Sequence, residues 1–440
     1  MTTNLVRFTF EKREISCAEG TSVAGALLSH GTSILTRSFK YRRPRGYTCG
    51  YGACPNCPLT VNGLPGVTGC VTPAENGMVV SRERGWPSST WDVFGITSVF
   101  AKYLSAGFQF RHFAHHPRLA HHVETVMAHI AGSGRAPSQQ AVARIVLGEG
   151  TRISTLPRLP DVVVVGGGLS GCQAALSAAR TGAHVLLVND GELGGRSLAG
   201  RYRTTVGADG EAHVTAVLAR EVAESVRAMA PTVTVIDGVA VGWFEGGLLA
   251  IAGTGVDLTL EPEHLIIATG SYELADLYPG NDLPGTILCG GVERLLHRDG
   301  VRPGRRAVIV TDSDDGAEIA KDLQRSGIRV EAIVDKRIDG ARIERAYGRR
   351  RVRGVRIAHR DGRTTKRSCD LIVHALGERP AEELSTQWLA VQPELDGRRM
   401  WTVGSACTDD RGGLSPLQHA AQVGELAAAI ARDTEGEQPW

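Results

Sequence analysis

A glycine-rich turn between a strand and a helix is the feature that most constrains the fold. Residues 161–165 read DVVVV, and such a continuous β-branched run is typical of a strand buried on both faces. The sequence GGGLSG follows at 166–171 and opens a helix of small residues, after which a second apolar strand is predicted at 183–188. Strand, G-x-G-x-x-G loop, helix and strand in this order indicate a Rossmann-like α/β domain that binds a dinucleotide.

Each glycine of this loop meets a steric need. Gly166 permits the tight turn, Gly168 lets the pyrophosphate approach the backbone, and Gly171 lets the helix pack closely on the strand. The N-terminus of the helix, which includes Ser170, would then face the phosphates. We therefore expect all four residues to bind the cofactor.

The residue that should hold the ribose is unusual. An acid is expected about 20 residues after the loop, at the end of the second strand. The chain has Asn189 at this point, followed by Asp190. Because either side chain can hydrogen-bond a ribose hydroxyl, both are expected at the cofactor. The sequence leaves open whether that cofactor is FAD or NAD.

A second unit of this kind spans residues 306–335 but lacks the glycine loop. Its loop at 311–316 reads TDSDDG. Only one glycine remains, and three carboxylates stand where a pyrophosphate would bind, which disfavours that ligand because like charges repel. We expect this second fold to serve structure or docking, without a working NAD(P)H site.

Four cysteines near the N-terminus indicate a redox centre. They follow the spacing C-x4-C-x2-C and then x12-C, the plant-type [2Fe–2S] pattern: Cys49, Cys54, Cys57 and Cys70. Gly50 and Gly52 permit the backbone angles that such a loop needs. A four-cysteine zinc site, whose ligands more often come as two close pairs, and unrelated thiols are the alternatives. A predicted strand at 5–10, a predicted hairpin at 59–67 and a predicted strand at 77–81 place the loop in a compact β-rich domain.

Composition and charge exclude several classes of function. No apolar run approaches the roughly 20 residues of a membrane span, and the first residues lack the pattern of a secretory signal. A cytoplasmic protein without structural disulfides is therefore predicted, with peripheral attachment to the inner face of the membrane left open. The net charge of +2 and the lack of interleaved aromatics in the arginine-rich segment 349–356 argue against nucleic-acid binding.

A basic loop, RSFKYRRPRGY at 37–47, precedes the cysteines. Its five basic residues between Arg37 and Arg45 would guide an acidic electron partner or grip a cofactor phosphate. A solvated surface loop is the alternative, since charge runs are common surface features. No Ser-His-Asp or Cys-His pattern and no local acid–base pair is visible, so no catalytic residue is predicted in this chain.

Further motifs resemble those of the two-dinucleotide-domain flavoprotein disulfide reductases. These motifs are the glycine pair at 194–195, IIATG at 266–270, VHALGERP at 373–380 and the return segment TVGSACTDDRGGLSPLQHAAQVGELAAAIA at 402–431. The resemblance implies that the second domain interrupts the first, which the chain re-enters through the return segment. Ser405 takes the place of the acid that usually holds the flavin ribitol. The resemblance adds these cofactor-binding candidates: Gly194, Gly195, Arg196, Thr269, Gly270, Gly404 and Ser405.

The segments RSFKYRRPRG, VFAKYLSAGFQFRHF and AGSGRAP precede the glycine loop in that order. Over nearly the whole chain this order resembles the α subunit of heterotetrameric sarcosine oxidase and of the related proline dehydrogenase, opine oxidase and hydrogen cyanide synthase complexes. The resemblance implies a partner β subunit of the D-amino-acid-oxidase type, which oxidises the C–N bond of an amino or imino acid with its own FAD. Further small subunits and an FMN at the α–β interface are also expected.

The function implied is that of an electron-transfer subunit of a multi-subunit amine or imino-acid dehydrogenase or oxidase, acting on sarcosine-, proline- or opine-like CH–NH donors. Electrons would pass from the partner flavin to the [2Fe–2S] cluster and on to an external acceptor. Two alternatives stand beside it. One is a stand-alone NAD(P)H-dependent reductase of the ferredoxin-reductase kind, and the other is a structural NAD-binding scaffold subunit.

The predicted fold class is α/β, with two Rossmann-like dinucleotide-binding domains preceded by a β-rich plant-type [2Fe–2S] ferredoxin-like domain. The [2Fe–2S] domain is predicted at 1–90 and a helical connector at 91–157. The first Rossmann-like domain, for FAD or NAD, takes residues 158–285 and 380–440, and the degenerate NAD(P)-binding-like domain takes 286–379.

Overall fold

The computed structural model describes most of the chain. The described residues are 4–39, 41–98, 115–116, 118–119, 121–123, 137–142, 153–201, 203–253, 255–338, 340–391, 399–407, 411 and 413–436. The chain forms two compact units. The N-terminal unit comprises residues 1–142 and 273–377, and the C-terminal unit comprises residues 143–272 and 378–440.

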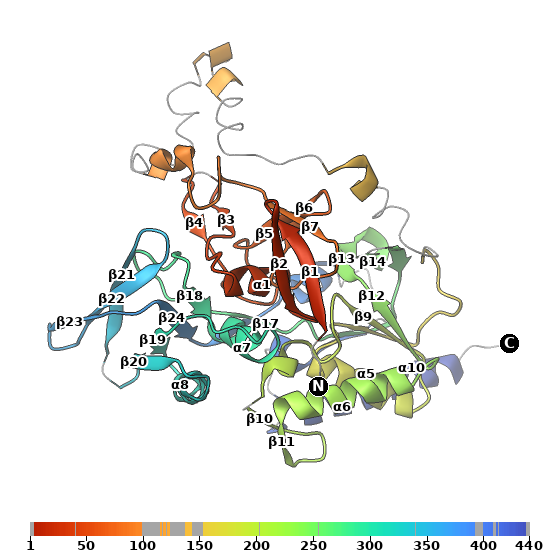
Figure 1. The fold of residues 1–440 in the computed structure, drawn as a ribbon. Coiled ribbons are helices and arrows are strands. Elements are labelled where there is room, and N and C mark those ends of the chain that lie inside the picture. Colours follow the sequence, from red (N-terminus) through yellow and green to blue (C-terminus); the bar gives the residue numbers. More distant parts are fainter. Residues whose placement is uncertain are drawn as a thin grey trace. The chain divides into compact units, whose positions relative to one another are not determined.

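The N-terminal unit begins with a five-stranded sheet of order β2-β1-β7-β5-β6 (Figure 1). Its elements are β1 Leu5–Phe10, β2 Arg13–Ala18, α1 Val23–Ser29, β3 Thr36–Arg37, β4 Pro44–Arg45, β5 Pro58–Val61, β6 Leu64–Thr68, β7 Val79–Arg82 and the 3₁₀ turn η1 Val93–Ser98. Strand β1 alternates apolar and polar residues, so Val6, Phe8 and Phe10 enter the core together. Helix α1 begins after Ser22, whose hydroxyl accepts the amide of Gly25 as an N-cap.

A parallel sheet of order β18-β24-β19-β20 forms the second part of the same unit. Its elements are β18 Thr286–Leu288, α7 Cys289–His297, β19 Arg306–Thr311, α8 Asp315–Arg325, β20 Arg329–Asp335 and β24 Leu371–Ala375. Three antiparallel strands follow β20 in the chain: β21 Arg342–Gly348, β22 Val352–Ala358 and β23 Thr364–Arg367. Residues 307–310 of β19 are completely buried, which is typical of a central parallel strand covered on both faces.

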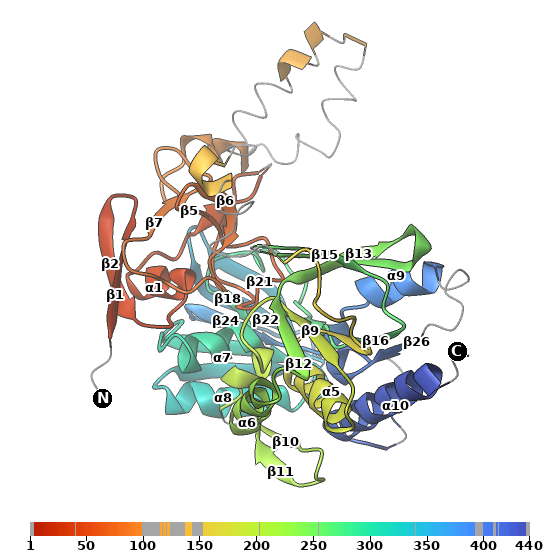
Figure 2. The same cartoon turned by 90° about the vertical axis from the view of Figure 1, so that its right-hand side faces the viewer.

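One hydrophobic core joins these two parts of the N-terminal unit. Phe8 and Leu27 belong to the same group of buried side chains as Val292 and Leu295 of α7. Helix α1 of the first part lies next to α7 of the second (Figure 2). The cysteine-bearing domain is therefore packed onto the second nucleotide-binding-like fold.

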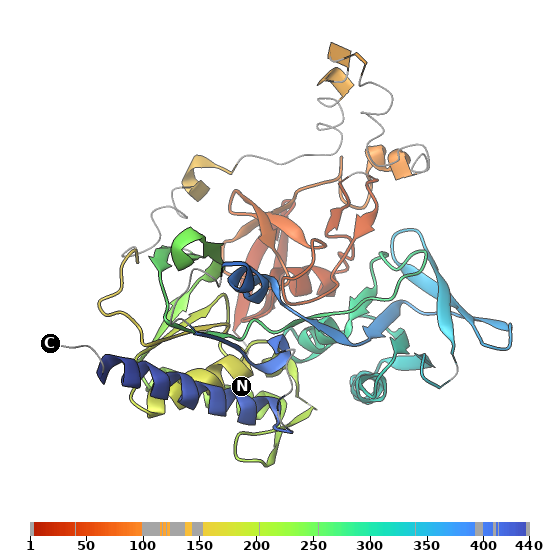
Figure 3. The same cartoon turned by 180° about the vertical axis from the view of Figure 1, so that it is seen from behind.

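The C-terminal unit is built on a parallel sheet of order β12-β9-β8-β16-β26. The elements of its sheet and helices are β8 Val162–Val165, α5 Leu169–Arg180, β9 Val185–Asn189, η2 Gly195–Ala199, α6 Thr215–Ala228, β12 Val233–Asp237, β16 His264–Ile267, α9 Glu383–Val391, β26 Arg399–Thr402, η5 Gly404–Ala406 and α10 Pro416–Gly436. The smaller strands and turns are β10 Thr204–Val206, β11 Ala212–Val214, β13 Val239–Phe244, η3 Glu245–Gly247, β14 Leu248–Gly253, β15 Val256–Leu260 and β25 Glu378–Pro380, with β17 Ser271–Glu273 where the chain passes between units. Helices α5 and α10 lie along each other (Figure 3), and a Cβ on Gly424 would lie only 2.3 Å from the Ala174 carbonyl oxygen.

The predicted fold class is confirmed. A β-rich domain precedes two parallel α/β sheets, and the second sheet interrupts the first in the chain. The domain boundaries stay predictions, and most of the predicted connector at 91–157 lies outside the described residues. No helix in the described ranges is long and apolar enough to cross a membrane.

Candidate functional site

The four predicted cluster cysteines come together. Cys49, Cys54 and Cys57 lie between β4 and β5, and Cys70 follows β6. Cys54 is partly buried, and the other three are no more than 2% exposed. The Cys49 thiol contacts those of Cys54 and Cys70, and the Cys57 thiol contacts that of Cys70. The hairpin β5–β6 turns the chain back and so brings the fourth cysteine to the other three.

Backbone amides are directed at these sulfurs. The amides of Tyr51 and Cys54 donate to the Cys49 sulfur. Amides of neighbouring residues donate in the same way to the sulfurs of Cys54 and Cys57. Two glycines have the left-handed backbone conformation that such a loop needs, with φ of 82° and 84°: Gly50 and Gly52. Hydrogen bonds of this kind stabilise negative charge on cluster sulfurs.

The four thiols share protons with one another. Hydrogen bonds from neighbouring thiols, first that of Cys54, lower the pKa of Cys49, and a bond from Cys70 lowers the pKa of Cys57. The pKa values of Cys54 and Cys70 are raised, first because each donates its proton to the Cys49 sulfur and then because of burial. Metal binding to four thiolates releases such protons.

Four cysteines are the ligand set of a [2Fe–2S] cluster, which divides them between two irons. On the thiol contacts and the amide hydrogen bonds, the residues present fit this cluster.

The cysteine loop also contacts β18 and α7, which the sequence did not predict. The amide of Leu288 donates to Thr48 O at 3.0 Å. A Cβ on Gly291 would lie 2.5 Å from the same oxygen, so no other residue fits at this approach of two backbones. The amide of Glu273 donates to the Tyr51 hydroxyl at 3.0 Å. The glycine pair at 290–291, at the start of a helix, was the only local signal for this contact.

The glycine loop of the C-terminal unit has the close approaches that its spacing predicts. A Cβ on Gly171 would lie 1.9 Å from Gly166 O, and a Cβ on Gly166 would lie 2.4 Å from Ala268 O. Nothing lies within 4 Å of a Cβ on Gly168, the N-cap of α5, which has no capping side chain. The Cβ side of Gly168 is therefore open at the start of α5, where a pyrophosphate is expected.

Asn189 braces this loop from the end of β9. Its Oδ1 accepts the amide of Gly167 at 2.9 Å, and its Nδ2 donates to Gly191 O. The next residue, Asp190, is exposed. Because both ends of the Asn189 amide are engaged, we expect the Asp190 carboxylate to be the group that holds a ribose hydroxyl.

Glycines from two other segments reach the same loop. Gly194 forms a β-bridge with Gly168, and a Cβ on Gly195 would lie 3.1 Å from Gly168 Cα. A Cβ on Gly404 of the return segment would lie 2.5 Å from Ser170 Oγ. The structure thus brings together the glycine loop, the glycine pair and the return segment, as the resemblance implied. Ser405, the residue after Gly404, is exposed.

Three further candidates have protein partners in the structure. The Arg196 guanidinium donates to Ser271 Oγ at 2.9 Å and to Glu378 at 3.0 Å. The Thr269 hydroxyl and the Gly270 carbonyl hydrogen-bond the backbone of the residue that follows β25. These contacts show what shapes the site, and the roles of the three residues at a cofactor stay predictions.

Comparison with known proteins identifies two kinds of domain in this chain. Residues 3–85 match the family described as 2Fe-2S iron-sulfur cluster binding domain, and residues 161–263 match the family described as FAD dependent oxidoreductase. The sarcosine oxidase α subunit of Rhizobium meliloti (strain 1021) is 30% identical over 458 residues, which cover 96% of this chain and 44% of that subunit. The chain is a homologue of sarcosine oxidase α subunits. It is an oxidoreductase with a [2Fe–2S] domain and an FAD-dependent oxidoreductase domain, as predicted.

Other relatives extend this comparison. The sarcosine oxidase α subunit of Corynebacterium sp. (strain P-1) is 32% identical over 188 residues, 40% of this chain and 19% of that subunit. The crystal structure of L-proline dehydrogenase from P. horikoshii matches the fold with a TM-score of 0.65 at 20% identity, over 100% of this chain and 75% of that one. The chain spans less than half the length of the α subunits that it resembles.

In this α-subunit homologue, an arginine binds the acidic loop of the second fold. The Arg337 guanidinium donates to Asp314 and Asp335 at 2.9 Å each, and these bonds, first that to Asp335, raise the pKa of Arg337. Asp335 ends β20, where the ribose acid of a dinucleotide site would stand. A Cβ on Gly316 would lie 2.4 Å from the Thr311 side chain, so the remaining glycine serves helix–strand packing. This arrangement supports the prediction that the second fold has no NAD(P)H site.

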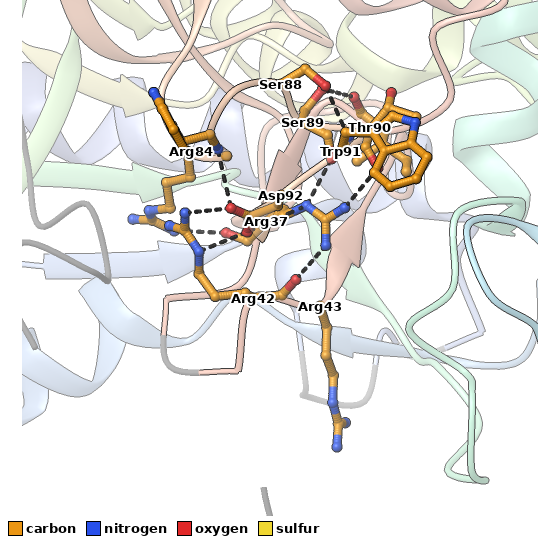
Figure 4. A network of polar contacts seen from close by, with 12 residues as sticks. Arg37, Arg42, Arg43, Arg84, Ser88, Ser89, Thr90, Trp91 and Asp92 are labelled. Carbon is orange, nitrogen blue, oxygen red and sulfur yellow. Dashed lines mark hydrogen bonds and ion pairs between the residues drawn. The ribbon is translucent and has the colours of Figure 1, made fainter. Parts of the chain in front are cut away.

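Two arginines of the basic loop, Arg37 and Arg42, are neither solvated nor available to bind a phosphate. Both arginines are no more than 8% exposed, and both point at the buried carboxylate of Asp92 (Figure 4). Arg42 binds Asp92 through two nitrogens at 2.8 and 2.9 Å, and Arg37 donates to Ser89 O at 2.7 Å. The sequence prediction is wrong for these two residues, because their partners lie about 50 residues away in the chain and leave no local pattern.

Removal of the Asp92 carboxylate is expected to unfold the cysteine domain readily. The substitution Asp92→Ala leaves two buried guanidinium groups without their counter-ion, and breaking a buried pair in this way costs about 3–5 kcal/mol. Urea unfolding of the full chain, followed by the visible circular dichroism of the cluster, measures this loss. Arg43→Ala is the control, since Arg43 is 49% exposed and its pair with Asp282 contributes at most about 1 kcal/mol. Equal midpoints for the two variants would contradict the prediction.

Proposed function

We propose that the chain is the electron-transfer subunit of a multi-subunit dehydrogenase or oxidase that acts on an amine or imino acid, such as sarcosine, proline or an opine. It passes electrons from a partner flavin to its [2Fe–2S] cluster and on to an external acceptor. The observation that carries this proposal is the set of four contacting thiols, three of them buried, with amides directed at their sulfurs. Similarity to sarcosine oxidase α subunits supports the substrate class.

The cysteine loop would hold the cluster and shield most of it from water. Cys49, Cys54, Cys57 and Cys70 are the proposed ligands. When bound, the cluster supplies reversible one-electron transfer. Three of its ligands are buried, whereas residues 52, 53 and 55 of the loop are exposed. An electron acceptor would therefore approach at the exposed tip of the loop, next to Cys54.

The glycine loop of the C-terminal unit would hold FAD. The first turn of α5 binds the pyrophosphate, Asp190 holds the ribose, and the return segment closes the site beside Ser170. When bound, FAD supplies the coupling of two-electron and one-electron transfer. The proposed contacts are Gly166, Gly168, Ser170, Gly171, Asn189, Asp190, Gly194, Gly195, Arg196, Thr269, Gly270, Gly404 and Ser405.

Substrate oxidation is assigned to a partner chain. No catalytic residue is proposed here, because the sequence has no Ser-His-Asp or Cys-His pattern and no local acid–base pair. The proposed partner is a β subunit of the D-amino-acid-oxidase type with its own FAD, together with further small subunits and an FMN at the interface. The complex is proposed to work in the cytoplasm.

Anaerobic purification of the chain together with its partner tests this function. The expected result is a brown protein whose visible spectrum, iron and sulfide content and extracted flavins show a [2Fe–2S] cluster and FAD. The complex should oxidise a secondary amine or an amino acid with an artificial electron acceptor. The proposal is wrong if no flavoenzyme copurifies and the reconstituted complex oxidises none of these substrates.

NADH is expected to be a poor reductant of the isolated chain. Three carboxylates stand in the loop where a second pyrophosphate would bind, and Arg337 binds Asp314 of this loop and Asp335 at the end of β20. In anaerobic stopped-flow mixing, NADH should bleach neither flavin nor cluster on a timescale of seconds, whereas dithionite should bleach both. Rapid bleaching by NADH would favour the stand-alone reductase instead.

The alternative of a structural scaffold subunit predicts a different colour for the purified protein. A structural NAD-binding subunit with a vestigial cysteine domain would be colourless after anaerobic purification. The contact of all four thiols within one loop region favours the cluster-binding subunit over this alternative.

A further inference from the structure

Helix α7 of the second fold carries two arginines to the cysteine domain. The helix begins where Gly291 meets the backbone of the cysteine loop at Thr48. Arg294 lies one turn further along, and Arg298 follows directly after the last residue of the helix. Both side chains are partly buried, and that of Arg298 reaches the backbone of Cys70. The second fold thus places guanidinium groups beside a proposed cluster ligand.

Arg298 and its neighbour Asp299 form a charge pair that fixes the interface. Arg298 donates through Nη2 to Cys70 O at 2.8 Å and through Nε to Asp299 at 2.9 Å. The Asp299 carboxylate is completely buried and accepts both the amide and the hydroxyl of Ser22, at 3.1 and 2.7 Å. A Cβ on Gly25 would lie 2.3 Å from this carboxylate. The pair therefore holds Cys70 on one side and the start of α1 on the other.

Arg294 adds a positive charge that this pair does not cancel. Its Nε is buried and has no hydrogen-bond partner within the described ranges. Burial first, and the nearby Arg298 second, lower the pKa of Arg294, but a guanidinium stays charged in proteins. Arg294 and Arg298 are four residues apart and so lie on one face of the helix, and together with Asp299 they carry a net charge of +1.

We propose that Arg294, which lies on α7 of the second nucleotide-binding-like fold, raises the reduction potential of the cluster. In this proposal Asp299 neutralises the charge of the neighbouring Arg298. Reduction adds one negative charge to the cluster, and a fixed positive charge in a partly dry interface stabilises the reduced state more than the oxidised one. The inference rests on the proposed function only in that it requires the cluster. In this proposal the second fold binds no NAD(P)H and instead sets the reduction potential of the cluster.

Substitutions that change charge in opposite directions test this proposal in the full chain. The readout is a redox titration followed by electron paramagnetic resonance of the reduced cluster, with iron content measured for each variant. Arg294→Gln should lower the equilibrium constant for reduction at least tenfold, which is about 59 mV for a one-electron couple. Asp299→Asn, which leaves Arg298 without its counter-ion, should raise the same constant. Arg294→Lys keeps the charge and should stay close to the unsubstituted chain.

A purely structural interface would give another pattern. Arg294→Gln and Asp299→Asn both disturb the same contact, so a packing effect would move both potentials in one direction or leave both unchanged. Either of these results overturns the proposal. If Arg294→Gln fails to bind iron, the direction of the Asp299→Asn shift decides the question. Arg363→Gln, at an exposed arginine paired with Asp361, is the matched control and should not shift the potential.

The same experiment separates this inference from the proposed function. An unsubstituted chain that binds no iron overturns both. A chain that binds a normal cluster, with potentials that do not respond to the charge at Arg294 and Asp299, overturns only the role of α7.

Discussion

Replacement of Cys54 by serine is expected to remove the cluster absorbance and to abolish electron transfer to an external acceptor. Cys54 supplies one of four thiols, and its sulfur contacts that of Cys49 beside the exposed tip of the loop. A serine hydroxyl is a harder and much more basic ligand than a thiolate, so the remaining three cysteines no longer hold two irons. Loss of a ligand should lower the rate of electron transfer to the acceptor by more than about 100-fold. Even the loss of a residue that only hydrogen-bonds a metal ligand lowers metal affinity or activity about 10–100-fold.

The substrate half of the reaction is expected to survive this substitution. In the proposed complex the amine is oxidised in the partner chain, so anaerobic addition of substrate to the Cys54→Ser complex should still bleach the partner flavin. Cys17→Ser is the control, because Cys17 is a buried cysteine of the same domain that lies on β2, outside the loop. It should keep iron, spectrum and turnover. Unchanged turnover in Cys54→Ser with the external acceptor would show that the cluster is not on the electron path.

The cysteine site was predictable because its chemistry is local. Three ligands lie within nine residues, and the fourth returns through a short hairpin, so the spacing alone carries the pattern. The glycine loop was predictable for the same reason, since Gly171 meets Gly166 within one turn of helix. Such contacts depend on neighbours in the chain and hardly on the rest of the fold.

The supports of these sites were not predictable in the same way. Ser22 and Asp299 are 277 residues apart, and Arg42 and Asp92 are 50 residues apart. Each buried carboxylate looks like an ordinary surface residue in the sequence, because its partner is fixed only by the tertiary fold. The basic loop was therefore misread as a surface feature, and the contact of α7 with the cysteine loop was missed.

The degenerate second fold was predictable from the sequence only in part. Its acidic loop indicated the loss of a pyrophosphate site, and Arg337 binds one carboxylate of this loop, that of Asp314. The sequence left its use open between structure and docking. The second fold shares a hydrophobic core with the cysteine domain through Val292 and Leu295 of α7. Helix α7 is therefore the part of this fold that docks on the cysteine domain.

Two substitutions in the glycine loop are expected to separate folding from FAD binding. Gly171→Val should prevent the C-terminal unit from folding normally, because even a Cβ would lie 1.9 Å from Gly166 O and 2.9 Å from the Ala268 side chain. Forcing a branched side chain between a strand turn and a helix costs about 3 kcal/mol or more. The cluster spectrum should persist, since the cysteines lie in the other compact unit.

Gly168→Ala should fold but bind FAD weakly. Its backbone has φ of −67°, which alanine adopts without strain, and no atom lies within 4 Å of the added Cβ. That open space is where the pyrophosphate is expected to touch the backbone, so a methyl group there should weaken FAD binding at least about tenfold, or about 1.4 kcal/mol. Thermal unfolding and the flavin retained after gel filtration measure the two effects. A Gly168→Ala chain that keeps its full flavin content would mean that the dinucleotide does not approach α5 in this way, and an equal loss of folding in both variants would mean that the loop shapes the unit without receiving a ligand.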